Sequence, residues 1–220
     1  DNPDDYIEGF PMHPHRGIET VTYMMSGEVH HRDSMGHSGS IGPGDLQWMT
    51  AGSGIMHEEM PQLRGGHLSG FQLWVNLPAK LKMSRPRYQE YLAAQVPVVK
   101  RPDGSTVKGI AGEYEGASGP VKDIAANPTY LDVTLEADAT FIQPIPNGHS
   151  CFEYVFQGDG DFGTQVKSPR LVVFSDGDSV EVKAGASGVR FILVSGKPLG
   201  EPVARYGPFV MNTKDEIRQA

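Results

Sequence analysis

The chain has 220 residues, of which 38% are hydrophobic, and a formal net charge of −8 at pH 7. It is long enough to bury a core in one large domain or two small ones. The negative charge argues against direct nucleic-acid binding, which needs a basic surface, and no apolar run reaches the ~20 residues of a membrane span. The one cysteine, Cys151, argues against a disulfide framework or a cysteine-based zinc site and favours a cytoplasmic location.

Strand signals dominate when the sequence is followed along the chain. Residues 19–25 are rich in β-formers and end at Ser26-Gly27, so residues 28–33 are expected to return as the second strand of a hairpin. Further strands are expected at 46–50, 70–77, 130–135, 152–156, 171–174, 179–182 and 189–194. Helices are expected only at 86–94 and 213–220. The 27 glycines and 17 prolines fit short strands joined by tight turns, as in a β-barrel or sandwich.

An internal repeat indicates two copies of one β-unit. Gly44-Asp45, five residues and Ala51-Gly52 have a counterpart in Gly177-Asp178, five residues and Ala184-Gly185. Tyr23 and Gly27 likewise match Tyr154 and Gly158. We therefore expect an N-terminal barrel over 1–80, a connecting segment over 81–126 and a C-terminal barrel over 127–220.

Two short segments that contain histidine carry the chemistry. In an extended strand, residues i and i+2 face the same way, so His13 and His15 share one side, and so do His57 and Glu59. Two such strands in a barrel would bring three imidazoles and one carboxylate to a single point. That set suits a borderline divalent metal and leaves coordination positions open. By the same alternation, Glu58 is expected to point away from the metal.

The second copy has lost every one of these ligands. Pro144-Ile145-Pro146 stands where the first copy has His13-Pro14-His15. With a one-residue shift allowed in the Gly/Ser turn, Phe191 and Leu193 stand where it has His57 and Glu59. We therefore expect the C-terminal barrel to be free of metal. Its interior is expected to be filled by Phe152, Tyr154, Phe156, Phe191 and Leu193.

The longer motifs resemble those of the pirin family, within the cupin superfamily. The resemblance covers nearly the whole chain. Its most specific strings are His13-Pro14-His15-Arg16-Gly17, then residues 44–52 (GDLQWMTAG), residues 73–77 (LWVNL) and residues 207–212 (GPFVMN). His13-x-His15-x₃-Glu19 resembles the first cupin motif, although its glycine spacing differs. Gly54-x₂-His57 resembles the second, in which Glu59 replaces the usual final Asn as the candidate that faces the metal.

This resemblance implies an all-β bicupin fold: two antiparallel β-barrels of the jelly-roll type with few short helices. It implies one divalent metal in the first barrel, held by His13, His15, His57 and Glu59. Iron(II) is the expected metal, with Zn, Ni, Cu, Mn or Co as alternatives. It also implies quercetin 2,3-dioxygenase activity, the cleavage of a flavonol by O₂ with release of CO, in which Glu59 is the candidate general base.

Family membership alone does not fix the role of the protein. One alternative is a metal- or redox-sensing regulator that binds a protein partner and turns over nothing, with a nuclear location if the source is eukaryotic. Another is a scaffold that the metal merely stabilises. In each case we expect a monomer that needs no membrane.

Other polar residues have plainer interpretations. The group His30, His31, Asp33 and His37 is expected to be solvated, although one member could line the mouth of the cavity. His67 and His149 are expected in a loop and a turn. Glu19 is expected to have a structural role or to support the metal ligands, and Cys151 to be a small buried residue.

Overall fold

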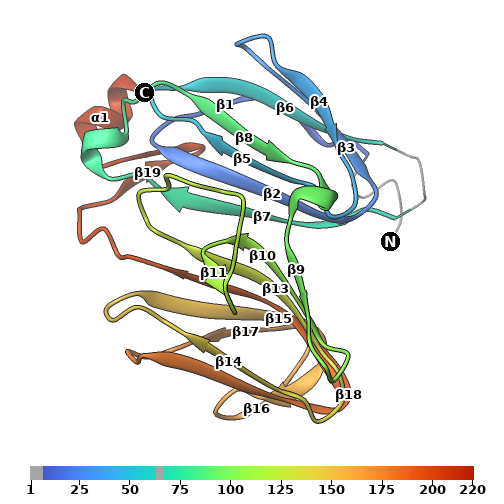
Figure 1. The fold of residues 1–220 in the computed structure, drawn as a ribbon. Coiled ribbons are helices and arrows are strands. Elements are labelled where there is room, and N and C mark those ends of the chain that lie inside the picture. Colours follow the sequence, from blue (N-terminus) through green and yellow to red (C-terminus); the bar gives the residue numbers. More distant parts are fainter. Residues whose placement is uncertain (1–6, 63–66) are drawn as a thin grey trace. The chain divides into compact units, whose positions relative to one another are not determined.

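The computed structural model describes residues 7–62 and 67–220, which form two compact units. Unit 1 comprises residues 1–95 and 199–220, and unit 2 comprises residues 96–198. In both units the strands pair antiparallel, and the helices are few and short (Figure 1). The predicted all-β fold is therefore confirmed. Within the described ranges, no helix is long and apolar enough to cross a membrane.

Unit 1 is built from two four-stranded sheets, ordered β1-β6-β3-β4 and β7-β2-β5-β8, with a small β19-β20 pair (Figure 1). Its elements are β1 (Phe10–His15), β2 (Ile18–Ser26), β3 (Glu28–Asp33), β4 (Ser38–Ile41), β5 (Leu46–Thr50), β6 (Ile55–Gln62), β7 (Ser69–Asn76), the 3₁₀ turns η2 (Ala79–Leu81) and η3 (Ala93–Gln95), β8 (Arg87–Tyr91), β19 (Ala204–Tyr206), β20 (Phe209–Met211) and α1 (Lys214–Gln219).

Unit 2 is built around a sheet ordered β16-β15-β18-β13-β10-β9, to which β14 and β17 add by pairing with β18 and β15. Its elements are β9 (Val98–Lys100), β10 (Thr106–Ala111), β11 (Glu113–Tyr114), β12 (Ala117–Ser118), β13 (Thr129–Leu135), β14 (Thr140–Pro144), β15 (Ser150–Asp161), β16 (Gln165–Lys167), β17 (Arg170–Val173) and β18 (Ser179–Gly196). The strands expected at 179–182 and 189–194 are thus parts of the single long strand β18.

The units divide the chain differently from the expected domains. Of the expected connecting segment 81–126, the first part supplies β8 to unit 1, and the remainder supplies β9 to β12 to unit 2. The last part of the expected C-terminal barrel, residues 199–220, belongs to unit 1. Long-range strand pairing decides this division, and neither the repeat nor the local composition records it.

The helix expected at 86–94 is wrong. Residues 87–91 form β8, which pairs with β5 from Leu46↔Tyr91 to Thr50↔Arg87. Tyr88 also packs against the buried cluster of Met49, Ala51 and Ile55. Pairing with β5 and burial of this tyrosine override the weak local helical signal. The terminal helix is confirmed: Thr213 caps α1, and Glu216 completes a capping box.

The core of unit 2 is apolar and dense, but part of its predicted lining is wrong. Phe191 and Leu193 are fully buried, as expected, whereas β15 turns Cys151, Glu153 and Val155 inward. The expected residues Phe152, Tyr154 and Phe156 lie on the other, partly exposed face of β15. Two further aromatic rings, Phe141 and Phe162, are buried in this interior and pack edge-on against Phe191.

Candidate metal centre

The three predicted histidine ligands converge in unit 1. β1 pairs antiparallel with β6, which places His13 directly opposite His57 and His15 opposite Ile55. His13 and His15 share a face of β1, and one nitrogen from each of the three rings lies within 4.8 Å of the others. The Nε2 atoms of His13 and His15 are 3.1 Å apart. The arrangement leaves three imidazoles aimed at one small volume.

Two backbone carbonyls orient the first two rings. The Nδ1 atom of His13 lies 2.8 Å from the carbonyl oxygen of Pro11, and that of His15 lies 3.3 Å from the carbonyl oxygen of Pro208. Because a carbonyl can only accept a hydrogen bond, Nδ1 is the protonated nitrogen in each ring. Nε2 is then the bare nitrogen that faces the shared volume. This is the usual arrangement of histidines that bind metals.

The third ring, that of His57, has no hydrogen-bond partner within the described part of the chain. His57 is 1% exposed, and neither of its ring nitrogens has a hydrogen-bond partner there. A buried polar atom left in this state costs about 1–3 kcal/mol. A cation bound by the three rings would give one of these two nitrogens a partner, so these residues fit a divalent metal. Three imidazole nitrogens suit Fe, Ni, Cu, Co and Zn rather than Mg or Ca.

The electrostatics of the cluster favour the form of histidine that binds metals. Burial, together with the neighbouring imidazoles, lowers the pKa of both His15 and His57 to about 4. Both rings are therefore neutral at pH 7. Metal binding needs deprotonated ligands, so it would release few protons here.

Glu59, the fourth predicted ligand, is not part of the group formed by the three rings. Its side chain is buried, and its two oxygens accept hydrogen bonds from Thr22 Oγ1 at 2.8 Å and Gln72 Nε2 at 2.5 Å. The register between β1 and β6 shifts between Phe10 and His13, so Glu59 lies opposite Phe10 rather than beside the histidines. Each oxygen retains capacity for a further contact.

Two further carboxylates, Glu58 and Glu19, lie outside the histidine group. Glu58 is on the other face of β6, where its carboxylate binds the guanidinium of Arg32 at 2.5 Å. Glu19 is buried and accepts a hydrogen bond from Thr50 Oγ1 at 2.7 Å. Burial raises the pKa of Glu19. Among the described residues it does not join the histidine group, so its visible contact is structural.

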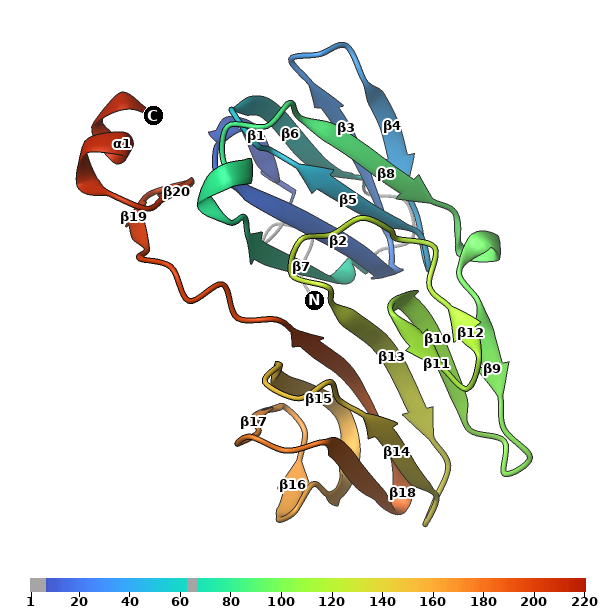
Figure 2. The ribbon, with the colours of Figure 1, turned by 60° about the vertical axis from the view of Figure 1, so that its left-hand side comes forward.

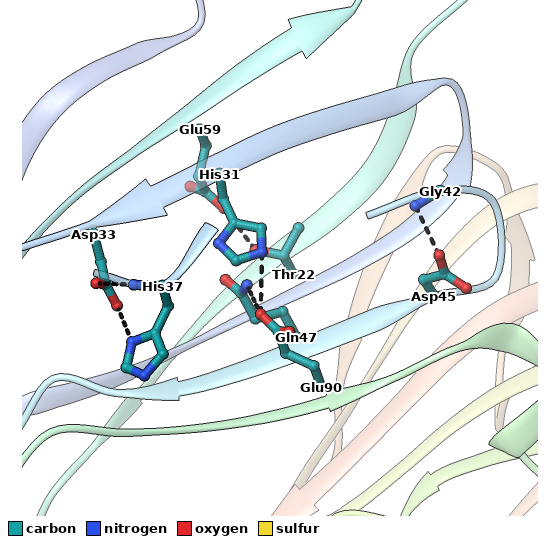
Figure 3. Close-up of polar contacts among 9 residues, drawn as sticks. All are labelled: Thr22, His31, Asp33, His37, Gly42, Asp45, Gln47, Glu59 and Glu90. Carbon is teal, nitrogen blue, oxygen red and sulfur yellow. Dashed lines mark hydrogen bonds and ion pairs between the residues drawn. The ribbon is translucent and has the colours of Figure 1, made fainter. Parts of the chain in front are cut away.

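The interpretation of His31 as solvated is wrong. β3 turns Val29 and His31 inward, and the His31 ring is 5% exposed. Its Nε2 lies 3.1 Å from Glu90 Oε1 (Figure 3). Glu90 also accepts a hydrogen bond from Gln47 Nε2 at 2.6 Å, and these contacts lower the pKa of Glu90.

The other members of that predicted group are more exposed. His37 binds Asp33 at 2.8 Å and His30 binds Glu28 at 2.7 Å, and both histidine side chains are more than half exposed. Strand alternation within 28–33 could have separated His31 from His30. Nothing in the local sequence indicates the partners that β2, β5, β7 and β8 supply across the unit; they are Thr22, Gln47, Gln72 and Glu90.

A cavity of about 140 Å³ is lined by Glu59 but by none of the three histidines. Glu59, Thr22 and Gln72 contribute its polar groups, and most of the remaining lining is apolar, including Phe10 and Phe71. Glu59 follows His57 by two residues on the same face of β6, so the polar part of the cavity and the third histidine share one strand face. Apolar walls with a few convergent polar groups are typical of small-molecule sites.

The remaining candidates do not belong to the histidine group. The backbone N–H of His149 donates to the carbonyl of Pro146 in a turn, and His67 lies just before β7. Cys151 is buried, and burial raises the pKa of its thiol to about 12. A thiol that stays protonated is a poor nucleophile and a poor metal ligand.

Comparisons with known proteins agree along most of the chain. Residues 1–75 match the family model described as Pirin, and residues 130–220 match the model described as Pirin C-terminal cupin domain. A pirin-like protein of Caulobacter vibrioides is 46% identical over 222 residues, which cover 100% of this chain and 80% of that protein. Pirin of Homo sapiens is 45% identical over 221 residues, which cover 96% of this chain and 74% of that protein.

A solved structure supports the same conclusion. The crystal structure of quercetin 2,3-dioxygenase from Acinetobacter baumannii is 37% identical, with a TM-score of 0.89. The match covers 96% of this chain and 75% of that one. The predicted bicupin architecture is thereby confirmed.

Proposed function

The chain belongs to the pirin family, and we propose that it is a metal-dependent dioxygenase that opens the ring of quercetin-like flavonols with release of CO. The observation that carries the proposal is the group of three imidazoles together with Glu59, which shares a strand face with His57 and lines a largely apolar cavity. The A. baumannii relative described above carries the name of this activity.

We propose His13, His15, His57 and Glu59 as the metal ligands and iron(II) as the metal. Histidines combined with one carboxylate and open positions are typical of non-haem Fe(II) oxygenases. To serve as the fourth ligand, Glu59 would turn from Thr22 or Gln72 toward the rings. When bound, the metal supplies a Lewis acid for the flavonol oxygens and a partner for O₂.

The side chains of the cavity have separate roles in this proposal. The flavonol rings lie between the apolar walls that include Phe10 and Phe71, which exclude water from the reacting end. The 3-hydroxyl faces Glu59, and the carboxylate takes its proton as general base. Whichever of Thr22 and Gln72 keeps its hydrogen bond after Glu59 turns toward the rings orients that carboxylate. The products are CO and an ester of two phenolic acids, and the proton is returned to the ester.

The first test concerns the ligands. We expect His57→Ala to remove most of the iron from protein reconstituted with Fe²⁺, because it deletes one of the three imidazoles that would hold the metal. His149→Ala should leave the iron content unchanged. Elemental analysis of both variants measures this. Iron retained in His57→Ala would contradict the assignment.

The second test concerns turnover. Glu59→Gln keeps the size of the side chain but removes the proton acceptor, and loss of a general base typically costs 10²–10⁴-fold in rate. We expect quercetin consumption and CO release under air to fall by at least about 100-fold. Glu58→Gln is the matched control and should keep the full rate, because Glu58 faces Arg32 on the other side of β6. Equal losses in the two variants would leave Glu59 without a special role.

A third outcome would favour the regulatory alternative. Protein that holds iron but consumes no quercetin would point to a metal- or redox-sensing role with a protein partner. A monomeric state and a location in the cytoplasm, or in the nucleus of a eukaryote, stay predictions.

A further inference from the structure

The segment 199–220, which we call the C-terminal strap, is distant in sequence from the metal centre but lies at the end of β1 (Figure 2). Phe209 forms a parallel bridge with Arg16, the residue that follows His15. The N–H of Val210 donates to the carbonyl of Arg16 at 3.1 Å. The guanidinium of Arg16 returns a hydrogen bond to the carbonyl of Gln219 at 3.0 Å. The strap is thus tied to the chain one residue beyond a proposed ligand.

A buried lysine fastens this junction. Lys82 is 1% exposed, and its Nζ donates to the carbonyl oxygens of Gly17 and Val210 and to Asn76 Oδ1, at 2.9, 2.8 and 2.7 Å. All three ammonium protons are therefore used. Two of the acceptors lie on opposite sides of the contact: Gly17 follows β1, and Val210 belongs to the strap. Because a buried cation is costly unless its hydrogen bonds are made, the junction specifies the position of the strap.

The closeness of this contact requires glycine at position 17. Gly17 has a φ of +78°, and a Cβ atom built there would lie 2.0 Å from the carbonyl oxygen of Val210. A side chain at this position would push the strap away. The contact is therefore a close approach of two backbones rather than a loose covering.

The strap also contacts the ligand His15 itself. The carbonyl of Pro208, two residues before Val210, faces His15 Nδ1 at 3.3 Å. Trp74 packs edge-on against the His15 ring, with 5.2 Å between ring centroids, and Arg205 of the strap lies 5.1 Å from the centroid of Trp74. The Pro208 carbonyl fixes which nitrogen of His15 carries the proton, and Trp74 limits the rotation of the His15 ring.

We propose that the C-terminal strap is a positioning element of the metal centre, anchored by Lys82 and acting on His15 through the Pro208 carbonyl. This inference rests on the metal centre proposed above. Removal of a group that supports a metal ligand typically lowers metal affinity by 10–100-fold. Coupling between two equilibria is reciprocal. Metal binding must therefore strengthen the contact between the strap and Arg16 by the same factor by which the strap strengthens metal binding.

The test uses Co²⁺ as the probe on the full chain. Lys82→Met keeps the length of the side chain and removes the three donors, and we expect Co²⁺ affinity, measured by competition with a chelator, to fall by about tenfold or more. Lys80→Met is the matched control, since Lys80 is exposed in the same 3₁₀ turn, and its affinity should not change. Val210→Pro, which removes the N–H donated to Arg16 and also replaces the buried valine side chain, is the second variant if Lys82→Met does not fold.

Two readouts separate positioning from general stability. In the parent protein, Co²⁺ should slow amide hydrogen exchange in 209–219, and in the variants this effect should shrink along with the affinity. Nitrogen NMR of the metal-free protein should show His15 protonated at Nδ1 in the parent and in Lys80→Met, and a mixture of the two tautomers in Val210→Pro.

The outcomes are distinguishable. Unchanged Co²⁺ affinity in both strap variants, or strap amides that do not respond to Co²⁺, would overturn the inference and leave the metal centre standing. A parent protein that binds no Co²⁺ and no Fe²⁺ would overturn the metal centre and the inference together.

Discussion

At the level of single residues, Glu153 is a carboxylic acid buried in the core of unit 2. Its side chain is fully buried, and neither carboxylate oxygen has a hydrogen-bond partner among the described residues. Burial raises its pKa to about 9. The acid is therefore neutral in the folded protein at pH 7, whereas in the unfolded chain it is ionised. Cys151, the titratable neighbour on the same strand face, has its own pKa raised to about 12 and stays neutral over this range.

This difference predicts how the stability of unit 2 depends on pH. Between the ordinary pKa of about 4.5 and the folded value of about 9, the folded state binds more protons, so the free energy of unfolding falls as pH rises. The slope reaches about 1.4 kcal/mol per pH unit. Glu153→Gln cannot ionise, and we expect it to be more stable than the parent at pH 8 and to lack this slope in urea unfolding. Glu181→Gln, on an exposed position of β18, should keep the parental slope. Parallel curves for parent and Glu153→Gln would contradict the prediction.

At the level of elements, the turn between β5 and β6 places the strand that carries His57. Gly52 has a φ of +53°, and a Cβ atom there would lie 2.2 Å from the carbonyl oxygen of Ser84. That same carbonyl accepts the N–H of Ser53 at 2.8 Å. The turn is therefore fitted against the chain beyond η2, and β6 begins directly after it.

Gly52→Ala tests this fit. Alanine carries the cost of a positive φ and also the collision with Ser84, and we expect the free energy of unfolding of unit 1 to fall by about 2 kcal/mol or more. Gly36→Ala is the control: Gly36 has a φ of +91°, but nothing lies within 4 Å of the added atom, so only the conformational cost applies. Urea unfolding measures both. An equal loss of stability in Gly52→Ala and Gly36→Ala would contradict the prediction, because it would show that the collision with Ser84 costs nothing.

At the level of the whole molecule, each unit has its own buried residues, but only unit 1 brings three metal-binding side chains together within the described part of the chain. A ligand stabilises the unit that binds it. We expect Fe²⁺ or Co²⁺ at 100 times its dissociation constant to add about 2.7 kcal/mol to the stability of unit 1 and nothing to that of unit 2. Hydrogen exchange at Val21 in β2 and Val133 in β13 would report the two units separately. Equal slowing of both amides would contradict the prediction of a metal-free second unit.

The sequence by itself determined the features that depend on neighbouring residues. The all-β class, most strands, the capped terminal helix and the shared face of His13 and His15 all follow from local periodicity and capping chemistry. The opposite faces of Glu58 and Glu59 follow from the same alternation. These features need no knowledge of what lies across the fold, which is why pattern alone suffices.

Only the tertiary structure decided which face turns inward and which side chains meet across it. Alternation groups the residues of β15 correctly, but it cannot say that the face with Glu153, rather than the aromatic face, is buried. Thr22 and Gln72 at Glu59, β8 in place of a helix, and the strap at His15 are all contacts between segments far apart in sequence. Their energies come from long-range hydrogen bonds and packing, to which a local pattern contributes nothing.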